Sequence, residues 1–141
     1  MPIRQTYICN GQGVVFEASG VVTSEEFFDT FVNYFNSPDD IFLPLKFSLT
    51  DLTAVERVEI STEDVADLGL TAKEAYQRNS DSIVAFAAPD DLTYGLAKVW
   101  TAWTGPQTWT TNLLRDRPSA ERWLRNELYA RFGMEYVDFE R

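Results

Sequence analysis

Segments with the pattern of β-strands alternate with segments with the pattern of α-helices along the last hundred residues of this 141-residue chain. The clearest strand lies in "SIVAFAAP", residues 82–89, an uncharged apolar run typical of a strand that is covered on both faces. Strands that are separated by helices pair in parallel, because a parallel connection needs a long crossover and a helix supplies it. The alternation therefore predicts an α/β domain with a mainly parallel sheet.

The first twenty residues have a different pattern. Two β-rich runs, residues 3–9 and 14–18, flank "NGQG" at residues 10–13. Asn-Gly between such runs indicates a hairpin, because both central positions of the favoured turn need a positive φ. We expect an antiparallel hairpin at the edge of the sheet and the order ββαβαβαβα. The chain is predicted to be a single domain over residues 1–141, with helices covering a mixed sheet.

Capping residues locate two of the helix starts. Thr23 with Glu26 has the spacing of a capping box, and so has Ser61 with Asp64. Thr71 begins a second capping pattern, so the segment after Ser61 is either a short helix followed by a longer one or one bent helix. The remaining expected elements are a strand over about residues 45–50 ended by Asp51-Leu52-Thr53, a helix from about residue 90 ended by Gly105-Pro106, a strand over about 107–113, and a helix from Pro118.

Composition excludes several classes of partner. The chain has 22 acidic and 12 basic residues, a formal net charge of −10, so we expect no nucleic acid partner. The longest apolar run is too short for a transmembrane segment, and no signal-peptide pattern follows Arg4. Cys9 is the single cysteine, so no internal disulfide can form. A cytoplasmic location is the expectation.

The sequence lacks the residue patterns of the common catalytic sites. The chain has no histidine, which excludes Ser-His-Asp and Cys-His arrangements and the usual histidine-containing metal sites. Adjacent carboxylates occur at the starts of expected helices, where they act as caps and as partners of the helix dipole. No glycine-rich nucleotide fingerprint is present. We therefore predict no enzymatic activity, no cofactor and no metal.

Aromatic residues leave two interpretations open. Trp100 and Trp103 lie three residues apart on one face of an expected helix, with Tyr94 nearby, and they either pack in the core or contact a ligand or partner. Together with Phe27, Phe31 and Phe35 they either fill the core or line an apolar cavity. The second arrangement would suit a carrier of a small hydrophobic ligand or lipid.

Four segments resemble a known family. They are "GVVTSEEFFD" (20–29), "SLTDLTAVERVEISTEDV" (48–65), "SIVAFAAPDDLTYGLAKVW" (82–100) and "RPSAERWL" (117–124). They resemble the SpoIIAA-like proteins of the STAS/SEC14 kind, an uncharacterised bacterial family, and "DLTAV" after a strand resembles the STAS domain of anti-sigma-factor antagonists. The resemblance implies a non-catalytic regulatory domain that acts through contacts with an unidentified protein partner, with a homodimer as an open alternative.

The resemblance also implies a phosphoacceptor. In the antagonists a serine at the start of the helix after "DL..V" is phosphorylated by a partner kinase, and the corresponding position here is Ser61, followed by Thr62. The other interpretation is that Ser61 caps the helix, a role that stabilises a helix by about 1 kcal/mol. Asp51 and Thr53 are either turn residues that close the strand or contacts to a ligand or partner.

Overall fold

The computed structural model describes residues 3–104 and 110–140, with only the backbone described at residues 92 and 99–104. The elements follow the predicted order, with one short helix and one 3-10 turn added. They are β1 (Ile3–Ile8), η1 (Cys9–Gly11), β2 (Gly13–Thr23), α1 (Ser24–Phe35), α2 (Asp39–Phe42), β3 (Phe47–Glu59), α3 (Thr62–Arg78), β4 (Ile83–Ala87), α4 (Asp91–Thr104), β5 (Thr110–Leu114) and α5 (Arg117–Phe132).

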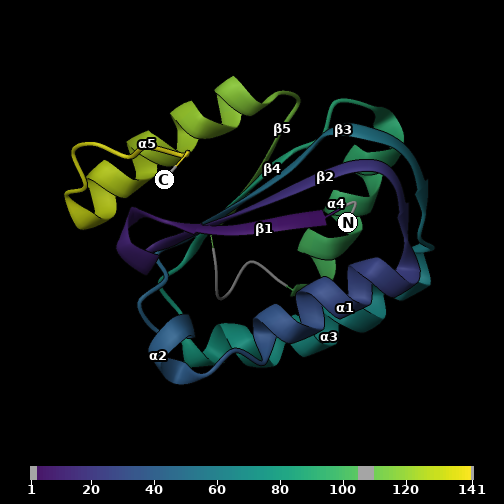
Figure 1. Ribbon diagram of the computed structural model, residues 1–141, viewed down its shortest axis with the longest axis horizontal. Helices are drawn as coiled ribbons and strands as arrows, with labels where there is room; N and C mark the ends of the chain where they lie inside the picture. The colour runs from purple at the N-terminus through teal and green to yellow at the C-terminus, as the bar shows by residue number, and fades with distance from the viewer. Residues whose placement is uncertain (1–2, 105–109, 141) are drawn as a thin grey trace.

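The sheet has the sequential order β1-β2-β3-β4-β5. The pair β1–β2 is antiparallel, and β2 to β5 are parallel, which confirms the predicted mixed sheet with a hairpin at one edge. Right-handed crossovers that connect parallel strands in sequential order all place their helices on the same face of the sheet. Figure 1 shows α1 and α3 on one side of the sheet, and α5 with the C-terminus on the other.

Each face of the sheet has its own hydrophobic core. Val14, Phe16 and Val84 belong to the core beneath α1, α3 and α4, whereas Val15 and Ala85 belong to the core beneath α5. Neighbouring residues belong to different cores because successive side chains of a strand point to opposite faces. All five residues of β4 are buried, as the uncharged run predicted.

Strand β3 is much longer than predicted. It runs to Glu59 instead of ending near Thr50, and β4 pairs only with Phe47–Asp51. Its register with β2 shifts twice. Glu17 pairs with Asp51, but Ser19 pairs with Ala54; further on, Gly20 pairs with Val55, but Val21 pairs with Arg57. Each shift leaves one extra residue on β3, which is a β-bulge. The expectation that Asp51-Leu52-Thr53 ends the strand is therefore wrong.

Local signals located most element starts correctly. The Thr23 side chain accepts from the Glu26 N–H, and Ser61 and Asp64 form the predicted capping box. Helix α3 is continuous through Thr71, so the alternative of two separate helices is wrong. At the hairpin, Asn10 and Gly11 have positive φ values of 56° and 84°. The expected strand over 107–113 is β5, and its residues 107–109 lie outside the described residues.

Candidate functional site: an apolar cavity and an arginine network

An apolar cavity of about 70 Å³ lies between the sheet and the helices α1, α3 and α4. None of the described residues that line it is charged, and threonine is the only polar type among them. They are Ile3, Phe16, Ala18, Val22, Phe27, Phe31, Thr50, Leu52, Val55, Val58, Ile60, Val65, Phe86, Thr93, Leu96 and Ala97.

The two bulges of β3 determine which side chains of this strand face the cavity. In a regular strand alternate residues share a face, so Thr50 and Leu52 would be followed on that face by residues 54 and 56. The extra residue before Ala54 brings Val55 to the cavity face, and the extra residue before Arg57 restores the original alternation, so that Val58 lines the cavity as it would in a regular strand. The bulges thus re-aim the Val55 side chain, whereas Phe16, Ala18 and Val22 of β2 keep the ordinary spacing of a strand.

Part of the cavity wall reaches the molecular surface. Phe27, Leu52, Val55, Val58 and Leu96 are only half-buried, while deeper wall residues such as Val65 and Phe16 are buried. A site of this kind binds an apolar group by excluding water and offers no acid, base or metal ligand from its described wall. The cavity has about half the volume of the roughly 150 Å³ engineered cavity that binds benzene in another protein.

The aromatic residues named from the sequence divide into three groups. Phe27 and Phe31 line the cavity, as the carrier hypothesis predicted. Phe35 does not line it; this side chain is buried between Tyr34 and Tyr76, with ring centroids 5.1 and 5.9 Å away. The side chains of Trp100 and Trp103 lie outside the described residues. Sequence patterns did not indicate Leu52, Val55 and Val58, because bulge positions have no clear sequence signal.

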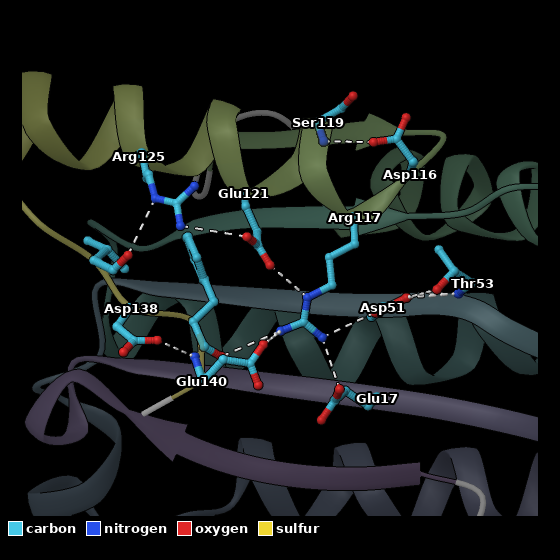
Figure 2. Close-up of polar contacts among 12 residues, drawn as sticks. Glu17, Asp51, Thr53, Asp116, Arg117, Ser119, Glu121, Arg125, Asp138 and Glu140 are labelled. Atoms are coloured by element: carbon cyan, nitrogen blue, oxygen red, sulfur yellow. Dashed lines mark hydrogen bonds and ion pairs between the residues drawn. The ribbon is translucent and has the colours of Figure 1, made fainter.

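A network around Arg117 lies on the opposite face of the sheet (Figure 2). The Arg117 guanidinium donates to Glu121 Oε2 at 2.8 Å, to Glu17 Oε2 at 2.9 Å and to Asp51 Oδ2 at 3.2 Å. It also approaches Glu140 Oε1 at 3.5 Å. The first residue of α5 thereby connects this helix to β2, to β3 and to the C-terminal segment.

Burial and hydrogen bonding act in opposite directions on the Arg117 pKa. Burial lowers this pKa, but the hydrogen bonds to Glu121, Asp51 and Glu17 raise it more, so the net shift is upward. The Glu17 pKa is lowered chiefly by the hydrogen bond from Arg4 and further by Arg117, against an opposing effect of burial. Arg117 therefore stays charged, and it adds to the effect of Arg4 in favouring the ionised form of Glu17.

Asp51 and Thr53 belong to this network. Asp51 Oδ1 accepts from the Thr53 N–H at 2.9 Å and from the Thr53 hydroxyl at 2.6 Å, while Oδ2 faces Arg117. The Asp51 side chain is 12% exposed. Its contacts are those of a structural carboxylate inside the fold.

Tyr94 and Ser61 belong neither to the described cavity wall nor to the Arg117 network. The guanidinium of Arg115 stacks on the Tyr94 ring at 4.0 Å from its centroid.

Ser61 is exposed, and its hydroxyl accepts from the Asp64 N–H at 3.1 Å, so the N-cap role is present in the structure. The Asp64 carboxylate accepts from Ser24, which lowers its pKa, together with the Ser61 hydrogen bonds. Thr62 is exposed as the first residue of α3, and phosphorylation at either position stays a prediction.

Within the part of the chain that the structure describes, no three His, Cys, Asp or Glu side chains gather as a metal site would require. The same residues include no helix that is both long and apolar enough to cross a membrane.

Comparison with known proteins supports the fold. No protein-family model matches the sequence, and no curated protein matches it. Among solved structures, the chain is similar to an uncharacterised protein of the DUF3478 family with a SpoIIAA-like fold from Shewanella loihica, with a TM-score of 0.50. The chain has a SpoIIAA-like fold. The match covers 86% of this chain and 91% of that one at 19% identity, so it is a likeness of fold, and it confirms the fold predicted from the sequence.

Proposed function

We propose that this chain is a non-catalytic interaction domain that binds a partner protein by taking an apolar side chain of that partner into the cavity. The cavity itself carries the proposal. Cavities in another protein destabilise the fold by about 24 cal/mol per Å³, which corresponds to about 2 kcal/mol for 70 Å³. Features that lower stability are typical of functional sites, and an incoming apolar group would recover this free energy.

The size of the cavity favours a side chain over a free ligand. A volume of 70 Å³ takes only a few carbon atoms, and even the best small ligands gain at most about 1.5 kcal/mol per non-hydrogen atom. A partner protein adds contacts outside the cavity to those of the inserted side chain. The inserted side chain then acts as an anchor at the centre of a larger interface.

A free small hydrophobic ligand is the second candidate. The half-buried wall residues Phe27, Leu52 and Leu96 favour it, because a longer molecule can place one end in the cavity and leave the rest along this rim. Such a ligand would be recognised mainly by apolar contact, since the described wall residues offer no charge and threonine is the only polar type among them.

Two matched variants test the site. Ala18→Val adds two carbons inside the cavity, where Ala18 is 4% exposed. Ala54→Val adds the same two carbons at an exposed position of β3 that does not line the cavity. Wild-type protein and both variants are used for affinity capture from the native organism, followed by a binding titration with each captured protein.

A partner that binds wild type and Ala54→Val equally, and Ala18→Val at least tenfold more weakly, supports the proposal. Equal binding of every captured partner to all three proteins refutes it. Native mass spectrometry of the same preparations tests the second candidate, which requires a bound small molecule in wild type that is absent from Ala18→Val.

A further inference from the structure

Strand β1 is an edge strand with one free side. Within the described residues it pairs with β2 alone, over six consecutive residues and with no break in register. Figure 1 shows no element in front of it on the side facing the viewer. Arg4, Gln5 and Tyr7 are exposed along this strand. The free side therefore presents a regular row of backbone N–H and C=O groups, which is a template for another strand.

A second unpaired stretch, along the end of β3, has protection that β1 lacks. Beyond the end of β4, residues 52–59 of β3 have no further strand beside them in the described chain. Two bulges interrupt this edge, and Glu56, Arg57 and Glu59 place charges along it. Bulges and charges are the devices by which proteins prevent pairing of sheet edges. β1 has no bulge and a single charge, Arg4.

Local charge permits a second copy of the chain to approach β1. The net charge of −10 opposes self-association in general. However, the first 16 residues contain no Asp or Glu, and Arg4 is paired with Glu17 at 2.7 Å. The β1 edge is thus close to neutral in an otherwise acidic chain.

We propose that β1 pairs antiparallel with β1 of a second copy, about a two-fold axis at Gln5, so that the two sheets become one. Residues directly opposite each other in an antiparallel pair share a face, so the register must pair odd positions with odd positions. With Gln5 at the axis, Ile3 lies opposite Tyr7 of the second copy, and Tyr7 lies opposite its Ile3. These are aromatic and β-branched pairs, which stabilise sheets. Tyr7, now 41% exposed, becomes covered.

The position of Gln5 on the axis provides a charge test. Gln5→Glu places two like charges opposite each other, and so does Gln5→Lys. Like charges directly opposite cost up to about 1 kcal/mol, so each variant should dimerise about fivefold more weakly than wild type. An equimolar mixture should form the heterodimer in preference to either homodimer. Gln77→Glu and Gln77→Lys make the same charge changes at an exposed position of α3 and should not alter dimerisation.

Sedimentation equilibrium measures the dimerisation constants, and native mass spectrometry with an isotope-labelled variant counts heterodimers. A second measurement tests the register: in a Cys9→Ala background, Gln5→Cys should form a disulfide-linked dimer under mild oxidation, and Gln77→Cys should not. A wild type that stays monomeric at all concentrations overturns the proposal. Dimerisation that is unchanged in both Gln5 charge variants also overturns it. Neither outcome bears on the cavity, because Gln5 does not line it.

Discussion

Replacement of Arg117 by alanine should destabilise the fold by about 3 kcal/mol. Removing one partner of a buried ion pair costs about 3–5 kcal/mol, because a buried charge is left without compensation. The Arg117 side chain is 17% exposed and the Asp51 side chain 12%. The lower end of the range applies, because Asp51 keeps its two hydrogen bonds from Thr53 and Glu17 keeps Arg4. For a chain of this length the loss corresponds to a fall in Tm of about 10 °C.

Urea unfolding followed by circular dichroism measures this loss. Arg131→Ala is the matched control, because Arg131 forms an exposed ion pair with Glu127 four residues earlier on the same helix, a pair worth less than about 0.5 kcal/mol. Adding Asp51→Asn to Arg117→Ala should recover part of the loss, since it removes the uncompensated charge. A loss from Arg117→Ala no larger than that from Arg131→Ala would refute the structural role of the network.

The network also predicts a dependence of stability on pH. The pKa of Glu17 in the folded chain lies below its ordinary value of 4.5. Its carboxylate therefore contributes stability that is present above pH 4.5 and is lost as the pH falls through the folded-state pKa. Because Arg117 is one of the groups that lower this pKa, the acid-induced loss should be smaller in Arg117→Ala than in wild type. An identical pH profile for the two proteins would contradict this.

Three further substitutions have defined outcomes. Gly13→Ala should cost about 1–3 kcal/mol in urea unfolding, because a Cβ there would lie 2.1 Å from the buried Phe47 ring; a cost near zero would show that the ring moves freely. Ser61→Ala should lower stability by about 1 kcal/mol through loss of the cap, whereas Thr62→Ala, its control, should change little. Ala18→Val should raise the free energy of unfolding by about 1 kcal/mol if it fills the cavity, and a decrease would indicate that the site is already full.

The sequence predicted the parts of the fold that depend on local signals. The turn at Asn10-Gly11 and the caps at Thr23 and Ser61 need only a few neighbouring residues, and the structure confirms each. The uncharged run of β4 correctly indicated burial on both faces.

The second half of β3 was missed for a physical reason. Its bulges space Leu52, Val55 and Val58 three residues apart, which departs from the two-residue period by which a strand is predicted. The contacts of Arg117 were missed because they join residues 66 and 100 positions apart, and no local pattern reports such distances. The cavity wall likewise depends on bulges and on contacts between residues far apart in the sequence. Of its aromatic residues, the sequence therefore predicted only Phe27 and Phe31.

Methyl NMR spectra recorded under xenon test most directly whether the cavity takes an apolar group. Xenon occupies apolar cavities without hydrogen bonds, so it reports the space itself. We expect saturable shifts of the methyl groups of Leu52, Val55 and Val58, with none at Leu124 and Leu128 in the core on the other face. Loss of these shifts in Ala18→Val, and their retention in Ala54→Val, would place the gas in the cavity. Absence of saturable shifts in wild type, or equal shifts on both faces, would contradict an apolar binding site between the sheet and the helices.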